Sequence, residues 1–279
     1  MELVRTIAAL KQRLRPLQAG GLRVGCVPTM GALHAGHLSL IADAKRRAEV
    51  VVATIFVNPL QFGPTEDLAK YPRQLERDAE QLAAAGCDVL FAPDPSEMYP
   101  SGFQTSVEVA EVTQGLCGAI RPGHFRGVTT VVLKLLSIVR PDVAVFGEKD
   151  YQQLTVIRQM ARDLALDVEI VGGALVRDPD GLAMSSRNAY LSADDRARAL
   201  SLSRGLAAAA ALHAAGTRDA VALVAAARAP LEAAGLVPEY LDLRAADDLR
   251  PLDRADVPAV LLVAARVGST RLIDNQKLG

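Results

Sequence analysis

The sequence predicts an α/β fold, with a Rossmann-like parallel sheet that has helices on both faces and a smaller C-terminal α+β domain. Up to about Val176, short apolar runs alternate with amphipathic helical patterns, as in consecutive βαβ units. After that point two alanine-rich helical stretches precede several short strands. A chain of 279 residues has room for both parts. We therefore expect domains at residues 1–176 and 177–279.

The N-terminal segment, residues 1–15, has leucine and isoleucine side chains at helical spacing with basic residues elsewhere. This pattern predicts a first helix packed on the sheet, and Pro16 should end it. A mitochondrial presequence shares such an amphipathic, basic character, but a packed helix is the simpler interpretation.

Five apolar runs predict the strands of the parallel sheet, at Val24–Val27, Val50–Val57, Val89–Ala92, Val143–Phe146 and Val168–Val171. Helical patterns lie between them, near residues 38–48, 72–85, 127–139 and 150–163. Sheets of this kind bind ligands at the carboxyl ends of their strands.

The C-terminal part should contain helices at about 193–213 and 217–234. The stretch Ala207–Ala211 favours helix over disorder, because alanine is the best helix former. Pro230 should kink the second helix or end it early. Short strands are expected near Glu239–Leu243, Ala259–Ala265 and Thr270–Ile273.

The composition bounds the possible partners and location. A net charge of −1 gives no basic excess for nucleic acid, and no apolar run is long enough to span a bilayer. Cys26, Cys87 and Cys117 lack metal or redox spacing, so we expect buried thiols in a reducing cytoplasm.

The most informative segment runs from Pro28 to His37 and places two of only four histidines, His34 and His37, around Gly36. It follows an apolar strand and precedes a helix, so its backbone N–H groups and the helix dipole suit a phosphate chain. Gly36 lacks the Cβ that would keep a ligand off the backbone. A single histidine is more often a packing residue, but two in this setting indicate a nucleotide site.

A second cluster, residues 56–63, begins as a buried strand and breaks at Asn58-Pro59. Asn58 and Gln61 offer neutral amides that can orient a polar substrate without the desolvation cost of a charge. An ordinary turn explains Asn58 equally well. Downstream, Glu66–Arg73 reads as an exposed loop that is either a lid or a plain connection.

Two further clusters open helices. Gly123–Val128 is either an anion-binding turn or a simple loop-to-helix junction. Phe146–Gln153 follows a strand, and Lys149 there can neutralise phosphate charge in a transition state. Asp150 is expected as an N-cap, with Gln153 one turn later on the same face.

The last cluster extends from Arg177 to Asn188. Its Asp-Pro-Asp-Gly part is a turn, whereas Met184–Arg187 places two hydroxyls and a guanidinium together, as a phosphate site would. Ser-Ser-Arg also occurs in plain loops. The sequence has no P-loop, no dinucleotide glycine fingerprint and no zinc spacing.

Taken together, these clusters closely resemble the pantoate–β-alanine ligase (pantothenate synthetase) family, within the wider nucleotidyltransferases that carry a His-x-Gly-His motif. The matching segments occur in the family's order and cover most of residues 23–190: Pro28–His37, Phe56–Phe62, Tyr71–Arg73, Gly123–Val128, Phe146–Gln153 and Asp180–Asn188. Arg271–Asn275 also fits. Leu136-Ser137 stands where the family commonly has Phe-Asn, and we expect only a packing change there.

The resemblance implies ATP as a substrate, Mg²⁺, a homodimer and a C-terminal domain that acts as a lid. It implies that the pantoate carboxylate attacks the α-phosphorus of ATP, giving pantoyl adenylate and pyrophosphate. The β-alanine amine then attacks the acyl carbon, giving pantothenate and AMP. Neither nucleic acid nor membrane is an expected partner.

By position, the resemblance also implies site residues. His37 would be the assigned acid, with His34 beside the phosphates, and Lys149, Ser185, Ser186 and Arg187 would stabilise the departing pyrophosphate. Gln61 and Gln153 would hold pantoate, with Asn58 nearby, and Gln61 would also face β-alanine. The ATP-binding set comprises Met30, Gly31, Ala32, Leu33, His34, Ala35, Gly36, His37, Gly147, Glu148, Lys149, Asp150, Val176, Met184, Ser185, Ser186 and Arg187. The Mg²⁺ ligands stay open, with Asp78 as one weak candidate.

Three alternatives compete with this interpretation. A related adenylyl- or cytidylyltransferase acting on another acid or phosphate would share the histidine pair, but the two glutamine-bearing clusters argue against it. A non-catalytic nucleotide sensor would bind ATP without forming AMP. A scaffolding protein does not explain why polar clusters gather at strand ends.

Overall fold

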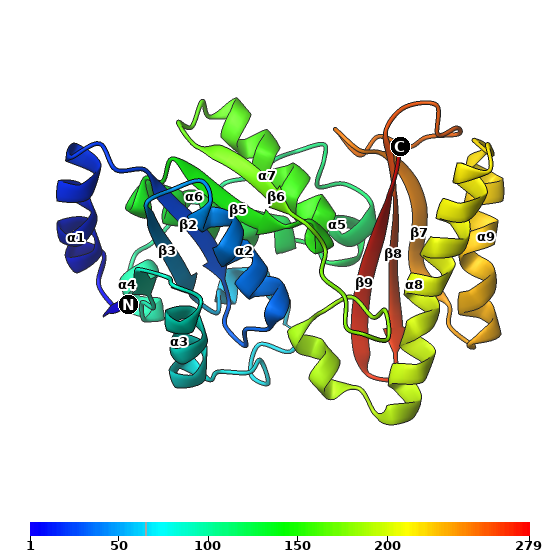
Figure 1. The fold of residues 1–279 in the computed structure, drawn as a ribbon, viewed down its shortest axis with the longest axis horizontal. Coiled ribbons are helices and arrows are strands. Elements are labelled where there is room, and N and C mark those ends of the chain that lie inside the picture. Colours follow the sequence, from blue (N-terminus) through cyan, green and yellow to red (C-terminus); the bar gives the residue numbers. More distant parts are fainter. Residues whose placement is uncertain (65) are drawn as a thin grey trace.

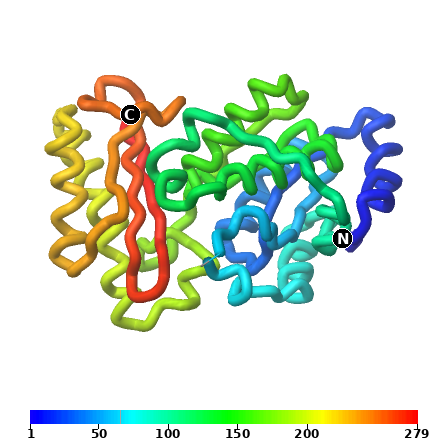
Figure 2. Tube along the Cα trace, turned by 180° about the vertical axis from the view of Figure 1, so that it is seen from behind, coloured from blue at the N-terminus to red at the C-terminus, as the bar shows by residue number. Residues whose placement is uncertain are grey.

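The computed structural model describes residues 1–64 and 66–279 and contains two sheets that lie side by side (Figures 1 and 2). The larger sheet has six strands in the order β1-β4-β3-β2-β5-β6, and every neighbouring pair is parallel. Its strands are β1 (Glu2–Val4), β2 (Val24–Thr29), β3 (Val50–Ile55), β4 (Val89–Phe91), β5 (Val143–Gly147) and β6 (Glu169–Gly173). The predicted Rossmann-like parallel sheet is confirmed.

Helices cover both faces of this sheet because successive strand residues point to opposite sides. Val24 and Cys26 of β2 pack into one core with helices α1 (Ile7–Ala19), α6 (His124–Val139) and α7 (Tyr151–Asp163). Val27, on the other side of β2, packs with α2 (Ala35–Lys45) and α3 (Leu75–Ala84). The short helices α4 (Pro95–Met98), α5 (Leu116–Ile120), η1 (Pro59–Gln61) and η2 (Glu148–Asp150) lie in the connections.

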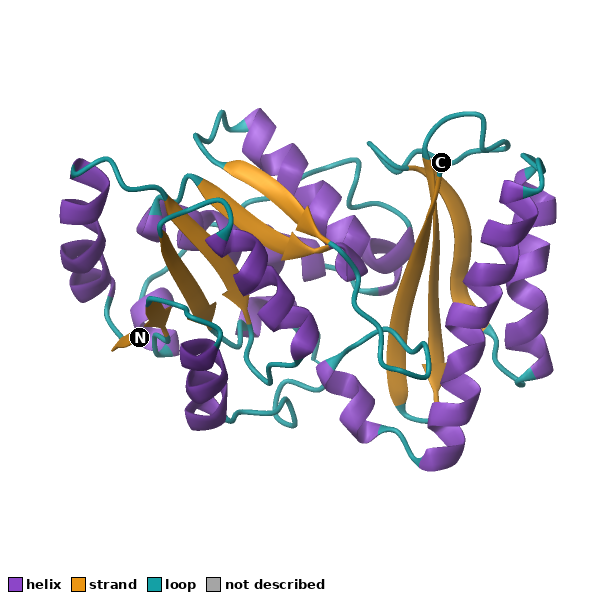
Figure 3. Ribbon diagram, viewed as in Figure 1, coloured by secondary structure: helices purple, strands orange, loops and turns teal. Residues whose placement is uncertain are grey.

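The second sheet is antiparallel, in the order β7-β8-β9, and helices α8 and α9 pack on one of its faces (Figure 3). The helices and strands of this half are η3 (Ser186–Tyr190), α8 (Ala193–Ala214), α9 (Ala220–Ala233), β7 (Pro238–Ala245), β8 (Ala259–Val267) and β9 (Thr270–Leu278). The opposite face turns towards the parallel half. There, Val260 and Leu262 of β8 join a small core with Leu116 and Tyr151.

The N-terminal helix prediction was wrong in its bounds. Residues Glu2–Val4 form strand β1 beside β4, and the helix runs from Ile7 through Pro16 to Ala19. Proline removes only the hydrogen bond to the Gln12 carbonyl, and both residues are exposed, so water can replace that bond. A three-residue strand is too short to give a period-2 signal.

Of the two outcomes expected for Pro230, an early end of the helix was also wrong, because α9 continues to Ala233. Pro230 lies in the last turn, and the carbonyl that it deprives of a partner, that of Ala226, is only half-buried. The strands and remaining helices lie where predicted, with bounds shifted by a few residues.

Two other expectations concern the whole chain. Cys26, Cys87 and Cys117 are free, buried thiols, as predicted, and burial raises the pKa of Cys26 to about 12. Within the described residues, we find no helix with the length and apolarity that a bilayer crossing requires.

Candidate functional site

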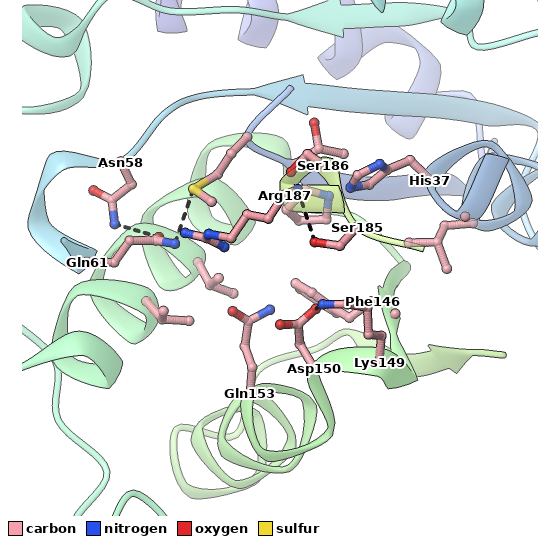
Figure 4. Close-up of a pocket in the computed structure, with 18 of the residues that line it drawn as sticks. His37, Asn58, Gln61, Phe146, Lys149, Asp150, Gln153, Ser185, Ser186 and Arg187 are labelled. Carbon is pink, nitrogen blue, oxygen red and sulfur yellow. Dashed lines mark hydrogen bonds and ion pairs between the residues drawn. The ribbon is translucent and has the colours of Figure 1, made fainter. Parts of the chain in front are cut away.

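The candidate site lies where the strand order of the parallel sheet reverses, between β2 and β5. Two adjoining cavities of about 220 and 740 Å³ open there, and they share lining residues that include Lys149 and Arg187. Open α/β sheets bind ligands at this position, outside the carboxyl ends of the strands. Side chains from all five predicted clusters line this space, and Figure 4 labels residues from four of them.

His34 and His37 stack at the start of α2, with ring centroids 4.1 Å apart. The His34 backbone N–H donates to Nδ1 of His37 at 3.4 Å, which leaves Nε2 of His37 to carry the proton of a neutral ring. Burial lowers the pKa of His37 to about 3, and the neighbouring His34 contributes to this lowering. Burial also lowers the pKa of His34. Both imidazoles are therefore neutral at pH 7.

The helix begins at Ala35, with His34 as its N-cap, rather than at His37, and Gly36 has a specific neighbour. A Cβ at Gly36 would lie 2.9 Å from Cε1 of His34, so the glycine makes room for that ring. Nδ1 of His34 is buried and has no hydrogen-bond partner in the described structure. Because α2 begins next to the cavity that His34, Gly36 and His37 line, its N-terminus is directed to the space where a phosphate chain would lie.

A tight turn precedes the histidines, with φ of +82° at Gly31 and +52° at Ala32. The fully buried Asp78 holds it, because its two oxygens accept from the backbone N–H groups of Ala32 and Leu33 at 2.8 and 2.9 Å. Asp78 therefore shapes the loop through both of its oxygens. Its suggested role as a Mg²⁺ ligand has no geometric support.

The amide of Gln61 is oriented by a chain of hydrogen bonds. Tyr99 donates to Oδ1 of Asn58 at 2.8 Å, and Nδ2 of Asn58 donates to the Gly127 carbonyl at 3.1 Å and to Oε1 of Gln61 at 3.0 Å. Because the Gly127 carbonyl only accepts, the Asn58 amide cannot flip. Nε2 of Gln61 is therefore directed to the cavity side, 3.2 Å from Sδ of Met30 (Figure 4).

A glycine lets this segment approach α6. A Cβ at Gly127 would lie 2.2 Å from the Leu60 carbonyl oxygen and 2.6 Å from the Gln61 nitrogen. The cluster at residues 123–128 thus packs against η1, and Gly123 occupies the N-cap of α6 with φ of +80°. Of the two interpretations left open, the loop-to-helix junction describes this backbone.

Arg121 and His124 line both cavities next to Gln61 and belong to no predicted site residue set. Nδ1 of His124 donates to the Gln61 carbonyl at 2.9 Å, and Nε2 accepts from Arg121 at 3.0 Å. Burial and the Arg121 charge lower the pKa of His124 to about 4, so this ring is also neutral. Arg121 forms a two-pronged ion pair with Glu66, with both distances 2.7 Å.

The cluster after β5 places Lys149, Asp150 and Gln153 on the wall opposite η1 (Figure 4). Asp150 stands at the N-cap of α7 but makes no capping hydrogen bond, contrary to expectation. Instead its carboxylate lies 3.6 Å from Nζ of Lys149. Burial opposes ionisation of Asp150, yet Lys149 and Arg187 keep its pKa below the usual value. Gln153 shares its face, as predicted.

Arg187 comes from the segment that joins the two halves, and its guanidinium is paired with Asp67 at 3.1 and 3.0 Å. Tyr71 supports this contact, since its hydroxyl lies 3.4 Å from Oγ of Ser186 and the Arg187 guanidinium lies 5.9 Å from its ring. Residues 67–71 therefore close over one side of the crevice. Figure 4 shows Arg187 and Ser185 directed into the same space as Gln61.

The structure brings most, but not all, of the predicted residues to the cavities. The predicted residues that line them are Met30, His34, Gly36, His37, Asn58, Gln61, Gly147, Lys149, Asp150, Gln153, Val176, Met184, Ser185, Ser186 and Arg187. Five predicted ATP-binding residues do not line either cavity: Gly31, Ala32, Leu33, Ala35 and Glu148. Glu148 is instead paired with Lys277 at 2.8 and 3.0 Å.

Sequence reasoning missed Arg121, His124 and Tyr99 as individual site residues. His124 was within a recognised cluster, so its polarity at a helix start was an available signal. Arg121 and Tyr99 stand in segments with no local signature. Among the described residues, no group of three or more His, Cys, Asp or Glu side chains could hold a metal ion.

Comparisons with known proteins agree with this geometry. A family model described as pantoate-beta-alanine ligase matches residues 2–277. A pantothenate synthetase from Myxococcus xanthus (strain DK1622) is 59% identical over 280 residues, covering 99% of this chain and 96% of that protein. The crystal structure of pantothenate synthetase from Thermus thermophilus has a TM-score of 0.95 at 47% identity and covers 99% of both chains.

A structure with bound molecules is also similar. The pantoate-beta-alanine ligase from Francisella tularensis, complexed with beta-gamma ATP and beta-alanine, is 35% identical with a TM-score of 0.83. The match covers 99% of this chain and 97% of that one.

Proposed function

The chain belongs to the pantoate-beta-alanine ligase family, and from this premise we propose which groups of the crevice carry out its reaction. It is an enzyme that condenses pantoate with β-alanine at the expense of ATP. The observation that supports the assignment of roles is that loops remote in sequence converge between β2 and β5. The steps below are argued from those loops.

In the proposed first step, ATP lies with its phosphates at the N-terminus of α2. A pantoate carboxylate oxygen attacks the α-phosphorus, the bond to the β-phosphate bridging oxygen breaks, and pyrophosphate leaves. His37 is neutral, so it acts as a hydrogen-bond donor through Nε2 rather than as a standing imidazolium. Triphosphate charge beside it would raise its pKa towards the acid role that the family resemblance implies.

The charge that builds on the departing pyrophosphate needs fixed cations and donors. Lys149 supplies an ammonium at the end of β5, and Arg187 supplies a fork that matches phosphate oxygens. Ser185 and Ser186 add hydroxyl groups on the same side. Since Arg187 is paired with Asp67, we propose that phosphate exchanges with or shares that carboxylate.

Pantoate is assigned to the space between Gln61 and Gln153. Its two hydroxyl groups and carboxylate suit the amides of these residues, with Asn58 fixing the orientation of Gln61. Its two methyl groups suit the apolar wall that Val131, Leu135 and Phe146 provide. Holding the acid against ATP supplies much of the rate, since well-oriented reactions gain about 7–11 kcal/mol.

In the proposed second step, the β-alanine amine attacks the acyl carbon, and AMP leaves with its phosphate oxygen. Arg121 lies beside Gln61, with Nη2 donating to the Gln61 carbonyl at 3.3 Å. Because its guanidinium is paired with Glu66, we propose that the β-alanine carboxylate exchanges with or shares that position, as phosphate does at Arg187.

Five further assignments are also proposals. Mg²⁺ would enter bound to the triphosphate, since it retains water ligands and needs few ligands from the protein. Asp150, whose carboxylate lines the smaller cavity, is the candidate protein ligand. We place the domain boundary at residues 176 and 177, because β6 ends at Gly173. The C-terminal domain as a lid, the homodimer and the cytoplasmic location rest on the family resemblance.

The test is product analysis with ATP, pantoate and β-alanine. We expect AMP, pyrophosphate and pantothenate in equal amounts, and exchange of pyrophosphate into ATP that depends on pantoate but not on β-alanine. Exchange that proceeds with another acid but not with pantoate would indicate a different transferase. ATP binding without AMP would indicate a sensor.

A further inference from the structure

Asn275, in the middle of β9, is bonded to the loop that carries Lys149. The residue is only 6% exposed, and its Nδ2 donates to the carbonyl oxygens of Glu148 at 2.9 Å and of Lys149 at 3.0 Å. Because both carbonyls only accept, the side chain at this position must be a hydrogen-bond donor, which a carboxylate is not. Asn275 lines neither cavity, so it acts on the crevice through this loop.

The preceding residue, Asp274, is bonded to the other segment that carries phosphate-binding groups. It accepts from Nη1 and Nη2 of Arg177 at 2.7 and 3.1 Å, and Nη1 of Arg177 also donates to the Gly181 carbonyl at 3.1 Å. Arg177 pairs with Ala183 across the turn, which leads directly into Met184–Arg187. The Asp274 side chain is 2% exposed, so breaking this pair leaves a buried charge.

The two residues also bind one another, since the Asn275 backbone N–H donates to Oδ1 of Asp274 at 2.8 Å. Two consecutive residues of the antiparallel sheet are therefore hydrogen-bonded to both loops that carry the proposed pyrophosphate-binding side chains, one with Lys149 and the other with Arg187. Both loops leave the parallel sheet, one after β5 and the other after β6, and β9 adds a second connection between them beyond the ends of those strands.

We propose that Asp274 and Asn275 are positioning residues for the ATP-dependent step, holding Lys149 and Arg187 at the spacing that pyrophosphate departure requires. This inference rests on the roles assigned to Lys149 and Arg187 above. A misplacement of about 1 Å in such a loop can cost roughly 100-fold in rate. On the pantoate side, Gln61 lies on η1, remote from β9, and Gln153 lies in α7, which is held by the packing of Leu154 and Ile157 in the core.

The experiment compares Asn275→Ala and Asn275→Asp with Lys277→Ala. The aspartate is isosteric but presents a carboxylate to two carbonyls. Lys277 is the matched control, because it joins the same strand to the same loop through the Glu148 carboxylate and leaves the backbone bonds intact. Rates of pantoyl adenylate formation are measured by rapid quench in a single turnover, with the pantoate Michaelis constant and thermal midpoint alongside.

We expect both Asn275 variants to form adenylate roughly 10- to 100-fold more slowly, with the pantoate Michaelis constant within about 2-fold of the wild type. Lys277→Ala should stay within about 2-fold in rate, as an exposed ion pair contributes little. A normal rate in Asn275→Ala, or an equal loss in Lys277→Ala, overturns the proposal. A lower thermal midpoint with normal kinetics also overturns it, because the role would then be structural only.

Two results separate this inference from the function beneath it. If the wild-type protein shows no pantoate-dependent pyrophosphate exchange, the proposed reaction itself is wrong. If Lys149→Ala forms adenylate at a normal rate, the role assigned to the Lys149 loop is wrong. If Asn275→Ala is not recovered folded, Asn275→Ser keeps a short donor and a smaller defect in packing. Its rate is then judged by the same criteria.

Discussion

The parallel sheet and the antiparallel sheet contribute to the crevice in different ways. Every strand of the parallel sheet runs in the same direction, so the loops after β2, β3 and β5 reach the same edge and carry His37, Gln61 and Lys149 there. The antiparallel sheet has helices on one face, and its other face packs on the parallel half. It contributes through two side chains in the middle of β9, Asp274 and Asn275, which are hydrogen-bonded to loops of the crevice.

This difference separates groups that touch the reactants from groups that hold those groups in place. Removing a group of the first kind should slow the chemical step directly. Removing a group of the second kind should slow it only by displacing the loop that carries a group of the first kind. Variants in the two sheets therefore test the comparison, and those in the loops of the parallel sheet should have the largest effects.

The largest effect is expected for Lys149→Ala, with His37→Ala close to it. Each removes one group that we assign to stabilising the departing charge, so adenylate formation should slow by roughly 10²–10³-fold. Single-turnover rapid quench measures it, with Lys277→Ala of β9 as the lysine control. Equal rates for Lys149→Ala and the control would remove the distinction between the two sheets.

The pH dependence of stability should also differ between the halves. Burial, aided by His34, lowers the pKa of His37 to about 3, below its ordinary value near 6.5, so the unfolded state binds the proton more readily. The stabilisation is complete above about pH 6.5 and is lost progressively as the pH falls towards 3. At pH 5 the loss amounts to about 1–2 kcal/mol.

Urea denaturation at pH 7 and pH 5 checks this expectation. His37→Asn should show a smaller loss of stability than the wild type, while His213→Asn, in α8, serves as the histidine control. If His37→Asn loses as much unfolding free energy between pH 7 and pH 5 as the wild type does, the result would argue against a neutral buried ring at this position.

Gln61→Ala should act on binding more than on chemistry. It removes a neutral hydrogen-bonding group from the pantoate side, which is worth about 0.5–1.5 kcal/mol. The pantoate Michaelis constant should rise roughly 3- to 10-fold, with a smaller change in that for ATP. An unchanged constant for pantoate would move the acid to another part of the crevice.

The smallest effect is expected for Tyr99→Phe. Its hydroxyl only orients Asn58, which orients Gln61, so the pantoate Michaelis constant should rise roughly 2- to 3-fold. Steady-state kinetics with varied pantoate and saturating ATP measure it. If the effect exceeds that of Gln61→Ala, the hydroxyl has a role beyond this chain of hydrogen bonds.

Sequence reasoning located the crevice where a polar segment follows a strand and precedes a helix. The segments around His37 and Lys149 have that local pattern, and the parallel sheet brings both to one edge. It failed for the prolines, because the carbonyls that they leave without a partner are at least partly accessible to water, and for β1, which is too short to show a period.

It also missed groups whose partners are distant in sequence. Tyr99 meets Asn58 across 41 residues, Arg121 meets Gln61 across 60, and Asn275 meets Lys149 across 126. A polar residue in the middle of a strand has the same local appearance whether it faces water or a catalytic loop. Only the packing of one half on the other distinguishes these cases.

The most direct test of the account is a crystal structure of the enzyme with pantoate and a non-hydrolysable ATP analogue. We expect one triphosphate that contacts the N-terminus of α2, Lys149 and Arg187 together, with pantoate between Gln61 and Gln153. In that complex a phosphate oxygen should replace or join Asp67 on the Arg187 guanidinium. A nucleotide bound to one loop alone, with Lys149 and Arg187 both remote from its phosphates, would contradict the account.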